Sequence, residues 1–212
     1  VGLIGGRGDL LQGEGVAGDG PTQLREPTDV AVARDGTIFV TEGHIKNGPS
    51  SRLSKFASDG TLVARYGMTG QGHLQLSAPH AIAIDSKDNI YIADRNNVRV
   101  QVYNTDGQLI DSWRNIVVPW GFCITANDDI WVCGSSPMKW RFNPKYPGAP
   151  LGCPPKDQVF MKFRPGGKLQ QMWTIPKATN GKEQPGELNW LHCLALDKDG
   201  NGEISAEEIK GA

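Results

Sequence analysis

Apolar and polar residues alternate in short runs along most of this chain, and the runs return with a common spacing. The segments that open at Pro27, Pro79 and Pro119 each begin with an alternating run, continue through a polar turn and then start a second apolar run. Alternation with a period of two predicts half-buried strands. Asp, Asn and Gly between the runs predict tight turns. Residues 79–113 carry the complete pattern, which predicts four antiparallel strands in about 40 residues.

A repeated four-stranded sheet of this length is typical of one blade of a β-propeller. The three units predict three blades, and a fourth opens at Leu191 with LHCLALDKDGN. The Gly-rich residues 1–24 parallel the connector at 62–78, so Val1–Ile4 would be the outer strand of a further blade. The expected fold class is all-β, an incomplete propeller of three full blades with partial blades at both ends. The outer strand and connector would occupy residues 1–24, and the blades residues 25–212.

An incomplete ring would leave sheet faces and strand edges without neighbours, and unpaired edges favour association. Two interpretations stay open. Either Val1–Ile4 adds to the last blade and closes a small ring, or the missing blades belong to a longer parent protein or to another chain. We favour a partial chain. Self-association, or binding of another protein through the open edges, is therefore expected, and a peptide ligand is a further candidate.

The overall charge argues against two classes of binding partner, nucleic acids and anionic membranes. The formal net charge is −1 at pH 7, which gives no electrostatic basis for binding nucleic acid or an anionic membrane. No apolar run approaches the roughly 18 residues that a membrane-spanning helix needs.

The four cysteines contain no C-x-x-C pair, and Cys123, Cys133 and Cys193 lie in apolar runs where a small buried thiol is expected. A disulfide among the cysteines is an alternative, so the redox compartment stays open.

Two stretches of the units show a family resemblance. PTDVAV opens the first unit at Pro27, and the second unit combines PHAIAI with ADRNNVRVQVY. With these motifs, residues 25–202 resemble the NHL-repeat β-propellers, and more specifically the propeller of peptidyl-α-hydroxyglycine α-amidating lyase and its bacterial relatives. The resemblance implies a parent fold that typically has six blades, a zinc-dependent cleavage of a C–N bond, and an extracellular or periplasmic location.

Residues at the same repeat position of a propeller converge on its axis from different blades. The second position of the four units is held by Thr28, His80, Trp120 and His192. Two converging imidazoles are candidate ligands of a shared metal ion, zinc in particular, although zinc needs a third ligand. The alternative is that these histidines only make hydrogen bonds inside the channel.

The family resemblance has mixed implications for single residues. His80 and His192 match two of the three histidines that hold zinc in the lyases. Arg95 matches an active-site arginine in the ADR motif. His44 stands where the lyases have their catalytic tyrosine, and Cys193 stands where an Asp usually follows the last histidine. The expected zinc site, with Arg95 and His44 as candidate catalytic residues, is therefore altered or incomplete, and His44 or a water molecule is the candidate third ligand for a metal ion held by His80 and His192.

The stretch DKDGNGEISAEE at 197–208 spells a different motif. Oxygen ligands at positions 1, 3, 5, 7, 9 and 12, with Gly at 6, define the Ca²⁺ loop of helix–loop–helix proteins. Every position matches, and the ligands would be Asp197, Asp199, Asn201, the carbonyl of Glu203, Ser205 and Glu208. Only four residues follow Glu208, too few for a stable exiting helix. A Ca²⁺ loop and a solvated, frayed chain end are both compatible with the stretch.

Three functional classes follow from these observations. The first is a propeller that acts as a binding or scaffold module, stabilised by a metal ion and self-associating. The second is a zinc-dependent peptidyl-hydroxyglycine amidating lyase whose site is completed by further blades. The third is a Ca²⁺-binding assembly subunit, in which the loop at 197–208 and the unpaired edges join copies together.

Overall fold

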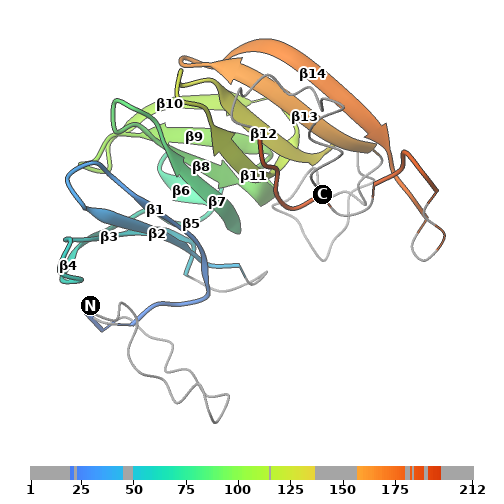
Figure 1. Cartoon of the computed structure of the whole chain (residues 1–212). Helices are drawn as coiled ribbons and strands as arrows, with labels where there is room; N and C mark the ends of the chain where they lie inside the picture. Colours follow the sequence, from blue (N-terminus) through green and yellow to red (C-terminus); the bar gives the residue numbers. More distant parts are fainter. Residues whose placement is uncertain are drawn as a thin grey trace.

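The computed structural model describes residues 20–21, 23–44, 50–114, 116–136, 157–179, 182, 184–188 and 191–196. Within these residues the chain forms three four-stranded antiparallel sheets, one after another along the sequence. Figure 1 shows the three sheets fanned side by side. The predicted all-β fold with four-stranded blades is confirmed.

Each of the three sheets is a meander in which consecutive strands pair with one another. The first blade contains β1 (Pro27–Val32), β2 (Ile38–Glu42), β3 (Arg52–Phe56) and β4 (Leu62–Tyr66). The second blade contains β7 (Pro79–Ile84), β8 (Ile90–Asp94), β9 (Arg99–Tyr103) and β10 (Leu109–Arg114). The third blade contains β11 (Val118–Ile124), β12 (Ile130–Ser135), β13 (Asp157–Arg164) and β14 (Lys168–Pro176). The remaining elements are the parallel pair β5 (Met68–Thr69) and β6 (Gln75–Leu76), and the 3₁₀ turn η1 (Arg95–Asn97).

A tight turn joins the first two strands of each blade. One residue of the turn has a positive φ in every blade: +86° at Gly36, +60° at Asp88 and +62° at Asp128. This left-handed conformation suits Gly and is tolerated by Asp. The Asp88 carboxylate accepts a hydrogen bond from the backbone N–H of Arg34 at 3.4 Å, and Asp128 accepts one from Ser86 at 2.8 Å. The turns therefore also fasten each blade to the one before it.

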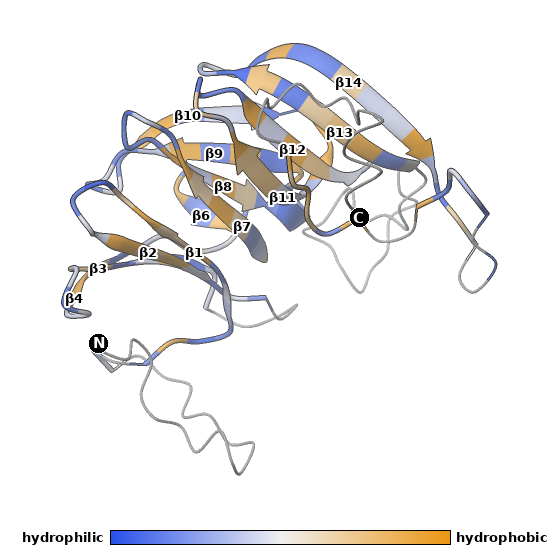
Figure 2. Cartoon of the chain, in the orientation of Figure 1, coloured by the Kyte–Doolittle hydropathy of each residue, from blue (hydrophilic) through white to orange (hydrophobic). Residues whose placement is uncertain are grey.

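Two apolar cores lie between consecutive blades, on strands along which Figure 2 shows orange, hydrophobic residues interspersed with hydrophilic ones. The core of the first and second blades is made by Ala33, Phe39, Leu53, Leu76, Ile82, Ile90, Ile92 and Tyr103. The core of the second and third blades is made by Tyr91, Val100, Val102, Trp113, Ile116, Val117, Ile130, Val132, Val159, Met161 and Phe163. Because side chains alternate along a strand, the middle sheet buries one face in each core.

The first strand of each blade lies on the inner side of the fan. β7 contacts β1 on one side and β11 on the other, whereas β4, β10 and β14 form the outer edges (Figure 1). This radial order of strands is that of a β-propeller. It brings the beginnings of the inner strands together, and with them the residues of the second repeat position.

The predicted partial blades are only partly described. Residues 191–196, where the sequence predicts the first strand of a fourth blade, belong to no strand, and the residues expected to pair with them lie outside the described ranges. Val1–Ile4 and the loop at 197–208 also lie outside the described residues. In the part of the chain that is described, no helix has the length and apolar character that crossing a membrane requires.

Candidate functional site: histidines, Trp120 and Arg95 at the inner strands

Three histidines and a tryptophan meet where the inner strands begin. The ring centre of His80 on β7 lies 5.5 Å from that of His44, 5.5 Å from that of His192 and 4.8 Å from that of Trp120. The ring centres of Trp120 and His192 are 4.5 Å apart. The side chains that the repeat places at the second position of three units thus lie together, and His44 joins them from the residues after β2.

The imidazole of His80 is held by a main-chain group. Its Nδ1 lies 2.6 Å from the carbonyl oxygen of Trp120. Burial lowers the pKa of His80 to about 4, although the hydrogen bond to the carbonyl acts in the opposite direction. The imidazole is therefore neutral at pH 7. Since a carbonyl only accepts, Nδ1 carries the proton and Nε2 keeps its lone pair for another group.

Arg95 brings a positive charge to the cluster. Its guanidinium carbon lies 4.8 Å from the centre of the Trp120 ring, and Nη1 lies 3.5 Å from Nε2 of His44. A further, long hydrogen bond runs from Nε to Oδ1 of Asn96 at 3.4 Å. Burial lowers the pKa of Arg95, yet a guanidinium stays protonated at neutral pH. No carboxylate of the described residues forms an ion pair with it.

Gly43 determines how His44 reaches the cluster. The φ of Gly43 is +104°, and a Cβ at this position would lie 2.5 Å from Cα of Ser51. Only glycine fits so close to another main chain with a positive φ. Burial, and secondly the charge of Arg95, lower the pKa of His44, so the neutral imidazole is favoured here as well.

His192 reaches the cluster on a segment that forms no strand. The N–H of Leu191 donates to Oε1 of Gln158 on β13 at 2.7 Å. On β11, a Cβ added to Gly121 would lie 2.6 Å from the carbonyl oxygen of His192 and 3.1 Å from Cα of Cys193. The glycine therefore lets this segment lie directly against β11, which places the His192 ring beside Trp120.

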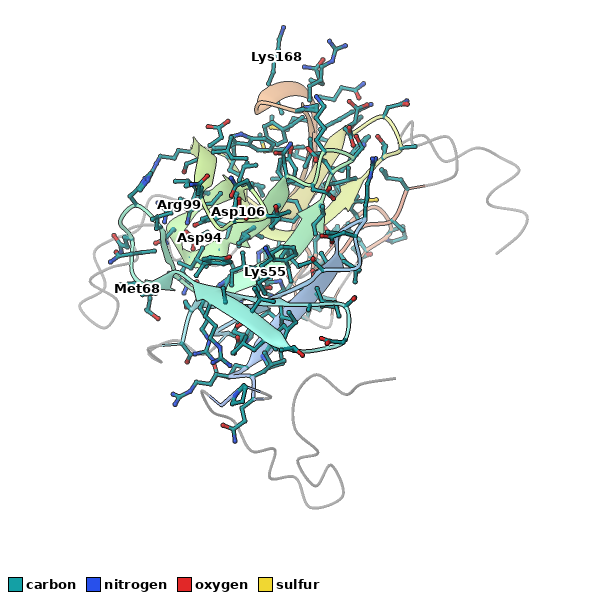
Figure 3. All side chains as sticks on the ribbon, turned by 90° about the vertical axis from the view of Figure 1, so that its left-hand side faces the viewer. Lys55, Met68, Asp94, Arg99, Asp106 and Lys168 are labelled. Atoms are coloured by element: carbon teal, nitrogen blue, oxygen red, sulfur yellow. The ribbon has the colours of Figure 1, made fainter. Side chains whose placement is uncertain are left out.

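A buried ion pair fixes the residue before Arg95. Arg99 and Asp94 have side chains that are 1% and 0% exposed, and Nε of Arg99 donates to the Asp94 carboxylate at 2.6 Å (Figure 3). The same carboxylate accepts hydrogen bonds from the N–H of Ser77 at 2.7 Å and from the side-chain amide of Asn97 at 2.8 Å. Because Arg95 follows Asp94 directly, this network holds the start of η1 and the main chain of Arg95 in place.

Sequence reasoning found the histidines and Arg95 but gave Trp120 no role. The structure places Trp120 in contact with His80, His192 and Arg95. Its place at the second repeat position was the available signal. A flat aromatic ring under a guanidinium contributes about 0.5–2 kcal/mol to holding the cation. The ring of Trp120 therefore supports the guanidinium of Arg95 and orients it in the cluster.

The metal predictions have different outcomes. In the described ranges, no group of three or more His, Cys, Asp and Glu side chains has an arrangement suited to a metal ion. His80 and His192 remain a pair of candidate zinc ligands, and His44, whose ring centre is 5.5 Å from that of His80, does not complete a group of three suited to a metal ion in the described residues. The predicted Ca²⁺ ligands at 197–208 lie outside the described residues. Cys123, Cys133 and Cys193 are free thiols in the structure.

Comparison with known proteins supports the resemblance. Residues 76–103, from β6 to β9, match the family model of the NHL repeat. The chain is 32% identical over 114 residues to NHL repeat-containing protein 3 of Homo sapiens, covering 51% of this chain and 32% of that protein. It is 34% identical over 118 residues to Probable peptidyl-alpha-hydroxyglycine alpha-amidating lyase pgal-1 of Caenorhabditis elegans, covering 54% of this chain and 31% of that protein. The chain thus spans about a third of the length of these relatives.

Solved structures add a likeness of fold. A protein from Bacteroides fragilis aligns with a TM-score of 0.51 and 13% sequence identity, over 76% of this chain and 42% of that chain. Identity this low supports the fold alone. The comparisons therefore establish an NHL repeat and a sequence similarity to amidating lyases, and leave the ligand of the cluster to be inferred from its chemistry.

Proposed function

We propose that this chain is an NHL-repeat binding module whose cluster of Arg95, His80 and Trp120 receives the C-terminal carboxylate of a peptide. The observation that supports this proposal is a half-buried guanidinium without a carboxylate partner among the described residues. A partly desolvated cation gains most from an anion that supplies both charge and hydrogen-bond acceptors. The similarity to lyases named for peptidyl-hydroxyglycine substrates agrees with a peptide as the ligand.

The neighbouring groups match the other atoms of a peptide terminus. Arg95 offers donors to the carboxylate, and the neutral His80 offers Nε2 as an acceptor because its Nδ1 is engaged with the Trp120 carbonyl. A C-terminal residue carries an amide N–H a few bonds from its carboxylate, so both groups have a partner. Charge-assisted hydrogen bonds of this kind contribute about 1.5–3 kcal/mol.

The test uses a minimal peptide and its amide. We expect N-acetyl-Tyr-Gly with a free carboxylate to bind more tightly than the same peptide with a C-terminal amide, as measured by isothermal titration calorimetry. Arg95→Ala should weaken binding of the acid roughly tenfold to hundredfold, since it removes the charged hydrogen bonds. The same substitution should leave the weaker binding of the amide nearly unchanged.

Arg34 provides the matched control. It is an exposed arginine in the turn between β1 and β2, at the other end of the inner strands from the cluster. Arg34→Ala should bind the acid as the unmodified chain does. Equal affinity of the unmodified chain for acid and amide would refute the proposal, as would an equal loss in the Arg34 variant.

Zinc binding is a second candidate, favoured by the spacing of His80 and His192. Two imidazoles that share one tetrahedral zinc ion have ring centres roughly 5 Å apart, and these two are 5.5 Å apart. The hydrogen bond from Nδ1 of His80 to a main-chain carbonyl also fixes the tautomer that metal-binding histidines commonly use. The two side chains thus fit part of a zinc site, and a bound zinc ion would polarise a ligand oxygen there.

Zinc titration against a fluorescent chelator tests this second candidate. We expect the unmodified chain to compete for Zn²⁺ and His80→Ala to compete at least about tenfold less well, because one of two imidazole ligands is gone. His73→Ala is the control, since His73 is exposed on the connector before β6. Unchanged competition by the His80 variant would exclude the pair. Glyoxylate release from an α-hydroxyglycine peptide would extend the result to the lyase alternative.

The third functional class rests on the sequence. The Ca²⁺ loop at 197–208 lies outside the described residues, so a Ca²⁺-binding assembly role is kept as a proposal. An extracellular or periplasmic location is kept in the same way, because it follows from the resemblance to amidating lyases.

A further inference from the structure

The first blade exposes a sheet face that the second blade buries. Val30 on β1 lies in the same register against β2 as Ile82 on β7 does against β8. The two residues are therefore equivalent positions of the repeat. Ile82 is 5% exposed because it packs against the blade before it, whereas Val30 is 57% exposed. Val32 is equivalent to the partly buried Ile84 and is 61% exposed. Among the described residues, the leading face of the first blade is therefore apolar and exposed at Val30 and Val32, whereas Val40, which pairs with Val30, is buried.

The third blade exposes the opposite face. On β14, Trp173 lies in the same register against β13 as Trp113 on β10 does against β9. The two tryptophans are therefore equivalent positions of the repeat. Trp113 lies against Tyr91 and Phe163 with ring centres 5.5 and 5.0 Å away, and it is 6% exposed between the second and third blades. Trp173 stacks on Trp131 at 5.1 Å but remains 39% exposed. Trp131 itself is 3% exposed, so the trailing face of the third blade presents Trp173, stacked on a buried Trp131, where a following blade would pack.

The leading face also contains a hollow. An open cavity of about 300 Å³ is lined by Leu24, Pro27, Thr28, Asp29, Val30, Ile38 and Val40. It can take a large side chain from a partner. Exposed apolar side chains gathered around a hollow are a common mark of a protein–protein contact.

We infer that a second copy of this chain packs the trailing face of its third blade, with Trp173, against the leading face of the first blade, with Val30 and Val32. Inside the chain the same two kinds of face already meet twice, between the first and second blades and between the second and third. The copies would repeat that contact across a chain boundary. The two faces differ, so the contact is head to tail and can be extended by further copies.

Charged substitutions on each face test the inference with sedimentation velocity. We expect the unmodified chain to form concentration-dependent oligomers, and Val30→Asp/Val32→Asp and Trp173→Asp each to be monomeric alone. An equimolar mixture of these two variants should form a one-to-one dimer, because each keeps one intact face. Ile110→Asp is the matched control: Ile110 is 55% exposed on the outer strand β10, away from both faces, and its variant should associate like the unmodified chain.

Each other outcome contradicts the inference. An unmodified chain that is monomeric at every concentration would overturn the inference, because no second copy would then cover these faces. A mixture that stays monomeric would contradict head-to-tail pairing. Should Trp173→Asp fail to fold, Val30→Asp/Val32→Asp added in excess to the unmodified chain should cap its oligomers and reduce their size. Absence of capping would again overturn the proposal.

Discussion

Asp94→Ala is expected to lower the free energy of unfolding by about 3–5 kcal/mol, because it leaves a buried guanidinium without its partner. Arg99 is 1% exposed and also donates to the main-chain carbonyls of Gly72 and Gln75, at 3.0 and 2.6 Å. These contacts prevent the Arg99 side chain from turning towards water. Urea denaturation followed by intrinsic fluorescence, with the midpoint and slope fitted together, measures the loss.

Two further variants distinguish the ion pair from a general loss of charge. Asp106 lies in an exposed turn after β9 (Figure 3), so Asp106→Ala should change the unfolding free energy by about 0.5 kcal/mol or less. Asp94→Ala/Arg99→Met should recover part of the loss, because an apolar pair can replace a buried ion pair at little cost. A change below about 1 kcal/mol for Asp94→Ala would show that the Arg99 charge finds other compensation.

Trp113→Ala is expected to cost about 3–5 kcal/mol, the range for removing a large aromatic side chain from a core. Trp113 is 6% exposed in the core between the second and third blades, and its Nε1 donates to the carboxylate of Asp111 at 2.9 Å. Removing the indole leaves a cavity between the blades and an acceptor without its donor. Denaturant unfolding again measures the loss, at a protein concentration where the chain is monomeric.

The equivalent residue of the next blade supplies the comparison. Trp173→Ala, measured under the same monomeric conditions, should cost about 1 kcal/mol or less, because Trp173 is 39% exposed and stacks, among the described residues, on Trp131 alone. Equal losses for Trp113→Ala and Trp173→Ala would mean that the trailing face of the third blade is covered within the monomer. That result would also remove the basis for the contact between copies.

The Asp94 network connects stability to the candidate site. Asp94 is followed directly by Arg95, and its carboxylate accepts a hydrogen bond from Asn97 within the same 3₁₀ turn. Asp94→Ala should therefore weaken peptide binding in addition to destabilising the fold. Asp106→Ala should change neither property, since its turn lies at the end of β9 remote from η1.

The alternating runs and the polar turns were sufficient to predict the blades. Pro27 and Pro79 open the first strands of their blades, and Pro119 is the second residue of β11. The alternation works because a strand between two cores must present apolar side chains to both faces in turn. The repeat also predicted that His80 and His192 would converge, because equivalent positions of a propeller share one end of the inner strands.

Other features of the site were beyond the reach of the sequence. No pattern indicated that Arg95 would lie on the ring of Trp120, because the two residues belong to different blades and meet only when the blades pack. The close approach of residues 192–193 to Gly121 is likewise a distance between segments, and a glycine alone does not predict it.

By itself, then, the sequence determined which residues form strands, where the chain turns and which positions share the inner ends of the strands. These properties depend on local conformation and on a short period that the chain repeats. Only the tertiary structure decided which faces are buried, that Arg95 has no carboxylate partner in the described residues, and that Val30 and Trp173 remain exposed. Burial and pairing depend on which blades lie next to each other, and that is a property of the packed sheets.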